Sequence, residues 1–351
     1  MRDDGSRGKA STTRSLGHSS LEIPNLKVPK GSECTSLPAK GEFSFLWKSH
    51  VEPASLSSRM KLHPLVLLAP LGAALLLAPG CATQTPAVGT GPSFKGPVGL
   101  QLYSLRGQFT KSVPLGVEMT KSFGVHDVEL AGTYNLTPEK FRGMLTAAGL
   151  NPVSAHFSYE RYRDNPEGVA QEAHALGLKY AGVAWIPHQG AFDEAECRDA
   201  AKTFNKAGAV LAAHGIQFFY HCHGYEFEPF AQGTLMDLLI QETDPKLVAF
   251  EMDTTWVFFP GQDPAAWLLK YPKRWQLMHL KDLKKGVATG ALTGSTDPNN
   301  DVALGLGQLN WPAILRAAKK VGVKYYFIED ESAAAPEQIP QTLRCLEQVQ
   351  F

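Results

Sequence analysis

Two histidines, His221 and His223, follow an apolar run that begins after Gly215. The run is typical of a buried strand, and side chains of a strand alternate between its faces, so both histidines share one face at its carboxyl end. Neutral imidazole is a common ligand of transition metals, which makes the pair a candidate part of a metal site. Two hydrogen-bonded histidines at a polar strand end explain the pair slightly better on their own. The case for a metal therefore depends on the strands that follow.

Three later predicted strands end in residues that bind the same kind of metal. Asp253 ends the strand 247–253, His279 lies near the end of the strand 275–280, and Glu329 ends the strand 325–329. A single such residue is more often solvated or hydrogen-bonded. Four in register on consecutive strands, His221 included, predict one site for a divalent metal ion. Mixed nitrogen and carboxylate ligands suit Mn²⁺, Co²⁺, Zn²⁺ or Fe²⁺ better than Ca²⁺.

The elements that carry these residues alternate between strand and helix. Predicted strands cover 98–103, 125–130, 152–156, 180–186, the run after Gly215, 247–253, 275–280 and 325–329. Predicted helices cover 112–123, 137–149, 166–176, 193–214, 232–242, 264–269, 311–321 and 336–348. Eight such units predict an α/β fold with a single (β/α)8 TIM barrel of parallel strands over residues 98–351. An open doubly wound sheet is the alternative, but its Gly-x-Gly-x-x-Gly sequence is missing from the first turn.

A barrel of this kind gathers the carboxyl tips of its strands around one pocket. Further polar and aromatic residues at these tips are therefore candidates for binding a substrate: Gln101, Tyr103, Glu129, His156 and Trp185. Lys281 is equally consistent with a charge inside the pocket and with a surface lysine paired with Asp282. The glycine-rich loop 283–310 fits a lid over the pocket as well as it fits an ordinary mobile insertion.

The amino-acid composition argues against some binding partners and some kinds of fold. The 351 residues are 44% hydrophobic, with 34 basic and 34 acidic side chains, and beyond residue 59 there are 25 basic against 28 acidic ones. This balance argues against a nucleic-acid partner, which would require a basic surface. The five cysteines show no paired spacing, which argues against a disulfide framework. Cys222 alternates away from its histidine neighbours and is predicted to be a small buried hydrophobe.

The N-terminal residues 1–97 have the features of a targeting sequence with flexible flanks rather than those of a folded domain. Residues 60–81 run from a methionine through a basic start and an apolar stretch to small residues before Cys81. This order resembles a bacterial lipoprotein signal, which implies lipidation of Cys81, secretion across the inner membrane and a lipid anchor on the periplasmic side. A plain apolar helix is the alternative. Residues 1–59 are predicted to be a disordered or non-native extension, and residues 82–97 a flexible linker.

Several short segments resemble the sugar isomerase/epimerase group with the xylose isomerase-like TIM barrel, which includes the inosose dehydratases. They are residues 101–106, 128–132, 220–227, 250–253, 279–282, 305–311 and 327–329. The resemblance implies one divalent cation held by Glu, Asp, His and Glu from strands five to eight. Asp253, His279 and Glu329 match this set, whereas His221 stands at the position of the first glutamate. Trp256 replaces the histidine of the family's Asp-x-x-His, where it either stacks on a sugar or packs at the barrel rim.

The resemblance also implies an activity on a small-molecule carbohydrate. The main expectation is a metal-dependent isomerase or epimerase that acts on a ketose or keto-sugar through an enediolate. Glu329 is then a ligand and possible base, His223 or His156 the second acid or base, and Lys281 the charge that holds a substrate oxygen. The loss of one glutamate at His221 puts simple two-base epimerisation in doubt.

Two other functions remain open from the sequence. A metal-dependent lyase or dehydratase of a keto-glycoside or inosose is the first, because a secreted protein does not normally meet sugar phosphates. A sugar-binding barrel without turnover is the second, because the changed ligand at His221 is compatible with it. DNA repair is least favoured, since neither a larger ligand set nor a basic groove is present.

Overall fold

The computed structural model describes residues 87–351. The predicted extension 1–59, the predicted signal peptide 60–81 with Cys81, and residues 82–86 of the predicted linker lie outside the described residues. Within the described part of the chain, every helix is too short or too polar to cross a membrane.

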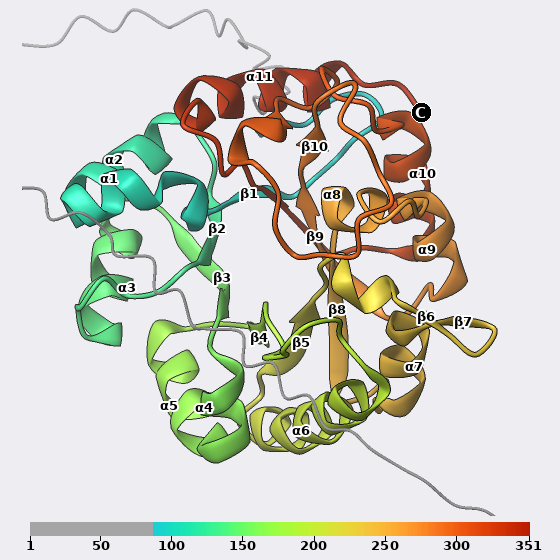
Figure 1. The fold of residues 1–351 in the computed structure, drawn as a ribbon. Helices are drawn as coiled ribbons and strands as arrows, with labels where there is room; N and C mark the ends of the chain where they lie inside the picture. Colours follow the sequence, from blue (N-terminus) through green and yellow to red (C-terminus); the bar gives the residue numbers. More distant parts are fainter. Residues whose placement is uncertain (1–86) are drawn as a thin grey trace, which may run out of the picture. The chain divides into compact units, whose positions relative to one another are not determined.

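Eight parallel strands close on themselves in the order β1-β12-β9-β8-β5-β4-β3-β2 (Figure 1). Closure is visible in β1, where Leu100 pairs with Val128 of β2 on one side and with Ile328 of β12 on the other. The strands are β1 Val98–Gln101, β2 Asp127–Leu130, β3 Asn151–His156, β4 Tyr180–Val183, β5 Gln217–His221, β8 Val248–Asp253, β9 Trp275–Leu280 and β12 Tyr325–Ile328. The predicted TIM barrel is confirmed.

Helices form an outer ring around the strands (Figure 1). They are α1 Arg106–Lys111, α2 Val113–Ser122, α3 Pro138–Ala147, α4 Tyr159–Asp164, α5 Pro166–Leu176, α6 Glu194–Ala213, α7 Leu235–Glu242, α8 Thr254–Phe258, α9 Pro264–Lys270, α10 Trp311–Val321 and α11 Ala335–Gln348. Local sequence explains several boundaries. Asp193 and Glu196 form a capping box at the start of α6, and Gly177 and Gly322 end α5 and α10 in the left-handed conformation.

Short elements complete the described chain. Two hairpins pair β6 Pro229–Phe230 with β7 Gly233–Thr234, and β10 Asp282–Leu283 with β11 Asp301–Val302. Three 3-10 turns are η1 Leu102–Leu105, η2 Tyr225–Phe227 and η3 Pro298–Asn300. The first hairpin delays the start of α7 to Leu235, three residues after its predicted start, because Thr234 caps that helix.

Apolar side chains fill the barrel in two layers. The large core lies between the strands and the helices, and a smaller cluster lies among the strands: Val153, Tyr180, Phe219, Ala249, Leu277 and Phe327. Strand alternation produces both layers, because successive residues face opposite sides of a strand. The inner cluster comes from the early and middle residues of its strands, which leaves the carboxyl ends for polar groups.

Three predicted strands end earlier than the sequence indicates. β1 ends at Gln101 because the Gln101 side chain accepts a hydrogen bond from the backbone N–H of Tyr103 at 2.9 Å and begins η1. β4 ends at Val183, so Trp185 lies in the following loop, and β5 ends at His221, two residues before His223. Tyr103 thus belongs to η1, and Trp185 and His223 are loop residues, rather than strand residues.

Candidate active site

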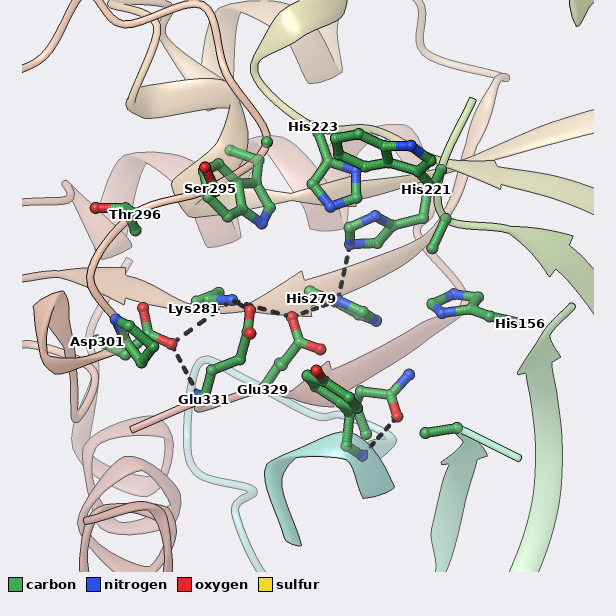
Figure 2. A pocket seen from close by; sticks show the side chains of 18 residues that line it. His156, His221, His223, His279, Lys281, Ser295, Thr296, Asp301, Glu329 and Glu331 are labelled. Atoms are coloured by element: carbon green, nitrogen blue, oxygen red, sulfur yellow. Dashed lines mark hydrogen bonds and ion pairs between the residues drawn. The ribbon is translucent and has the colours of Figure 1, made fainter. Parts of the chain in front are cut away.

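The four predicted metal ligands meet at the carboxyl end of the barrel, and Figure 2 shows three of them, His221, His279 and Glu329. We call them the donor cluster: His221 at the end of β5, Asp253 at the end of β8, His279 in β9 and Glu329 directly after β12. His279 Nδ1 lies 3.0 Å from His221 Nε2, 3.2 Å from Glu329 Oε2 and 3.7 Å from Asp253 Oδ2. His221 Nε2 lies 3.6 Å from Asp253 Oδ2.

This geometry suits a divalent ion. Ligand atoms bound at about 2.0–2.2 Å to a tetrahedral ion lie roughly 3.3–3.6 Å apart, which is close to the spacing within the donor cluster. Asp253 Oδ2 is buried and has no hydrogen-bond partner among the described residues, as expected for an oxygen whose partner is an ion. The residues present therefore fit the metal that the sequence predicts.

Glu129 of β2 fixes the orientation of His279. The Nε2 of His279 lies 2.7 Å from Glu129 Oε1, and Glu129 also accepts hydrogen bonds from Gln101 Nε2 at 2.7 Å and Ser154 Oγ at 2.6 Å. Burial alone would raise the pKa of Glu129, but His156 and His279 outweigh it and lower this pKa to about 2. An ionised Glu129 holds one proton of His279 on Nε2, so Nδ1 is the nitrogen that would bind an ion in the donor cluster.

His156 of β3 lines the same pocket and is paired with a buried carboxyl group. Its Nε2 lies 3.1 Å from Glu251 Oε2 and 3.4 Å from Glu129 Oε1. The His156 Nδ1 makes no hydrogen bond within residues 87–351. Burial raises the pKa of Glu251 well above its ordinary value, and Glu129 adds to the effect. The Glu251 carboxyl group can therefore readily take up a proton from His156 Nε2, an arrangement suited to acid and base catalysis.

Glu251 was not among the predicted site residues. It stands two positions before Asp253 on β8, so strand alternation places both carboxylates on one face. Glu129, His156, Glu251 and His279 also form a second group with the spacing of metal ligands. Both oxygens of Glu129 already accept hydrogen bonds. We therefore infer that this second group orients the side chains of His279 and His156 and does not bind an ion of its own.

Lys281 lies inside the pocket and is only 1% exposed. Its Nζ lies 3.3 Å from Glu329 Oε2 and 3.6 Å from Asp301 Oδ2, and it donates to Glu331 Oε1 (Figure 2). We call Lys281 and these three carboxylates the lysine cluster. The alternative of a surface lysine paired with Asp282 is wrong.

Asp282 instead anchors the segment that follows β11. Its carboxylate accepts hydrogen bonds from the backbone N–H groups of Gly305 at 2.9 Å, Gly307 at 3.1 Å and Leu309 at 3.2 Å, and from Trp311 Nε1 at 2.8 Å. The loop between β10 and β11 covers one side of the pocket with Gly294, Ser295, Thr296 and Pro298, and β11 adds Asp301. Asp301 and Glu331 were not predicted as site residues.

The remaining predicted residues surround a cavity of about 400 Å³. Gln101, Tyr103, Trp185, His223 and Trp256 all line it. His223 packs among rings, with centroids 5.5 Å from Trp185 and 5.4 Å from Trp256. Burial and His221 lower the pKa of His223 well below its ordinary value, so it is neutral. Trp256 is buried, whereas Trp185 and Tyr103 are largely exposed.

The Glu226 carboxylate binds the backbone N–H of His223. Its protonation should make the stability of the protein depend on pH. Both carboxylate oxygens accept from the N–H of His223, and Tyr220 donates its hydroxyl proton to the same group. Burial raises the pKa of Glu226 from 4.5 to about 7, against these hydrogen bonds. The folded state thus holds this proton more tightly than the unfolded chain, and the stability of the wild type falls as pH rises through this interval.

Glu226→Gln removes this titration. From pH about 4 to about 8 the free energy of unfolding of the wild type, measured relative to Glu226→Gln, should fall by roughly 3 kcal/mol. Urea unfolding of both proteins at several pH values measures it. A difference that stays constant over this range contradicts a tightly held proton on Glu226.

Comparison with known proteins places this site in a family. The family model described as xylose isomerase-like TIM barrel matches residues 116–349. The chain belongs to this family. The match covers every strand of the donor cluster and leaves only the first barrel strand outside it.

Relatives within the family include inosose dehydratases. One from Clostridium tetani is 36% identical over 97 residues, which are 27% of this chain and 32% of that protein. Inosose dehydratase 2 of Bacillus cereus is 27% identical over 178 residues, 49% of this chain and 56% of that protein. The chain therefore spans between a third and somewhat over half of the length of these relatives.

Solved structures share the barrel. A sugar phosphate isomerase/epimerase from Parabacteroides distasonis has a TM-score of 0.60 and 23% identity, over 76% of this chain and 96% of that one. The IolI protein, whose structure holds a zinc atom, has a TM-score of 0.57 and 14% identity, over 71% of this chain and 95% of that one. At these identities the likeness shows the fold.

Proposed function

We propose that this protein is a divalent-metal-dependent isomerase or epimerase of a ketose or keto-sugar. The observation that carries the proposal is the placement of the donor cluster beside the His156–Glu251 pair, with His221, His279, Glu329 and His156 lining one cavity. One group of residues fits a cation, and the other fits a group that exchanges protons with a bound molecule.

The donor cluster would hold the ion, which when bound supplies a Lewis acid for a carbonyl oxygen and its neighbouring hydroxyl. His156 takes the proton from the hydroxylated carbon next to the carbonyl on its Nδ1, and its Nε2 proton moves to Glu251 Oε2, 3.1 Å away. The hydroxyl proton passes to the former carbonyl oxygen, and His156 returns the carbon-bound proton to the neighbouring carbon. Lys281 donates a hydrogen bond to the oxygen that gains negative charge.

A dehydratase is the second candidate, and the names of the relatives favour it. Elimination begins with the same removal of a proton next to a carbonyl. It then requires an acid that protonates a departing hydroxyl on the following carbon. In Figure 2, Lys281 lies on the other side of His279 from His156, so its ammonium group is placed to supply that proton.

Deuterium exchange tests both candidates. We expect the full chain, loaded with Mn²⁺ and incubated in D₂O, to place deuterium on the carbon next to the carbonyl of fructose or of an inosose. An isomerised or epimerised product supports the main proposal, and an unsaturated product formed with loss of water supports the dehydratase. A chain that binds Mn²⁺ and the sugars without any exchange contradicts both and supports a sugar-binding barrel.

A further inference from the structure

We propose that the substrate is an uncharged molecule of two rings: a keto-sugar whose second ring, a sugar or an aryl group, stacks on Trp185. This inference rests on the proposed function and names its substrate class. Three sets of contacts support it: the charges of the cavity, the occupied backbone amides around it, and the way in which Trp185 is held.

The cavity offers no free positive charge to a phosphate. Among its lining residues in the described chain, Lys281 is the one lysine or arginine, and it is already engaged by the three carboxylates of its cluster. Arg106 lies beside the cavity, but its Nη1 donates to the carbonyl of Tyr103 at 3.0 Å and its Nη2 to that of Glu331 at 2.6 Å. A phosphate beside Lys281 would also meet Asp301 and Glu331, whose carboxylates already face that lysine.

Backbone amides could replace a cation, because many barrels bind phosphate in the loops after strands seven and eight. Here the chain's own carboxylates occupy five of the amides in these two loops. Asp282 accepts from Gly305, Gly307 and Leu309 in the first loop. In the second, Asp301 accepts from the N–H of Glu331 at 2.8 Å, and Asp330 accepts from that of Ser332 at 2.9 Å. This pocket therefore selects against phosphorylated sugars.

Trp185 is exposed but firmly held. The residue is 45% exposed, yet its ring stacks on His188 at 5.0 Å with 27° between planes and meets the edge of Tyr225 at 4.9 Å. The loop after β10 closes on it so tightly that a Cβ at Gly294 would lie 2.5 Å from Trp185 Cζ3. A fixed aromatic face that remains open to a cavity is suited to stack on the face of a second ring.

His223 is a neighbour of both the donor cluster and Trp185. Its ring centroid lies 5.5 Å from that of Trp185 and 4.9 Å from that of His221. A keto-sugar that is bound at the donor cluster and carries a second ring can therefore extend past His223 and stack that ring on Trp185. A glycoside whose sugar carries the ketone is such a molecule, and the cavity volume of about 400 Å³ lies within the range of pockets that hold such ligands.

Three probes separate this inference from the proposed function: glucose oxidised to a ketone at its third carbon, the phenyl glycoside of that sugar, and its 6-phosphate. The Mn²⁺-loaded full chain should exchange deuterium into the phenyl glycoside with a kcat/KM at least about tenfold above that of the free sugar. The 6-phosphate should be the poorest of the three. Exchange into none of the three probes, with exchange into fructose or an inosose retained, overturns only the two-ring, uncharged substrate, as does a preference for the free sugar or the phosphate. Exchange into none of these sugars, fructose and the inosose included, contradicts the proposed function.

Trp185→Ala should lower kcat/KM for the phenyl glycoside about tenfold more than it lowers that for the free sugar. Trp185→Phe keeps a ring at this place and should recover most of the difference. Equal losses on both substrates in Trp185→Ala, with no recovery in Trp185→Phe, would show that Trp185 has a merely structural role.

Discussion

Asp253→Asn and His221→Ala should each reduce the bound metal from about one ion per chain to near zero and lower activity at least about 100-fold. Asp253 Oδ2 is a buried member of the donor cluster, whereas its Oδ1 caps α8 by accepting from the N–H of Trp256 at 2.9 Å. Asparagine keeps an oxygen for this cap but removes the negative charge. The first variant therefore tests the ligand with little effect on the fold, and the second removes a ligand nitrogen from a different strand.

Metal content by mass spectrometry after dialysis measures the effect, with circular dichroism as the check on folding. His223→Ala is the matched control, because His223 lies beside His221 but outside the donor cluster. It should keep its metal. Folded Asp253→Asn and His221→Ala proteins that retain a full metal content would show that the donor cluster is not the site.

The barrel and the donor cluster could both be predicted because their signals are local. Trp275–Leu280 and Trp311–Val321 have the predicted bounds, since an apolar run marks the first and Gly322 ends the second in the left-handed conformation. The parallel topology then brings the strand tips together without further information. His221 and His279 are 58 positions apart in the chain, yet their ring nitrogens lie 3.0 Å apart.

Glu251 could have been found by the same reasoning. It shares a face of β8 with Asp253, and alternation over two residues is the rule that joined His221 to His223. The rule was less accurate for His223, because β5 ends at His221 and the hydrogen bonds from His223 to Glu226 turn the chain there. Where a strand ends depends on such contacts, which a periodic pattern does not contain.

The position of Asp301 and the burial of Lys281 are determined by the path of a long loop. Asp301 follows Lys281 by twenty positions, and it reaches the lysine because β10 and β11 pair and Asp282 binds the amides beyond. The residues of the loop indicate only that it can bend. The sequence therefore left Lys281 equally consistent with a surface and a buried position, and only its three carboxylate neighbours decide between them.

His156→Ala should lower the rate of deuterium exchange by about 10²- to 10⁴-fold while the metal content stays near that of the wild type. The metal should stay bound because His156 lies outside the donor cluster. Exchange should slow because His156 Nε2 exchanges a proton with Glu251. Glu251→Gln keeps the shape of that partner but cannot pass a proton, so it should also slow exchange at least about tenfold.

The control for these two variants is His126→Ala, whose side chain is 73% exposed and lies outside the cavity. Its exchange rate should equal that of the wild type. The comparison also decides between the two histidines that the sequence proposed as acid or base. If His156→Ala exchanges deuterium within about threefold of the wild type and a folded, metal-loaded His223→Ala protein does not, the proton is carried by His223. The buried pair of Glu251 and His156 would then serve only to orient His279, through the contact of 3.3 Å between Glu251 Oε2 and His279 Nε2.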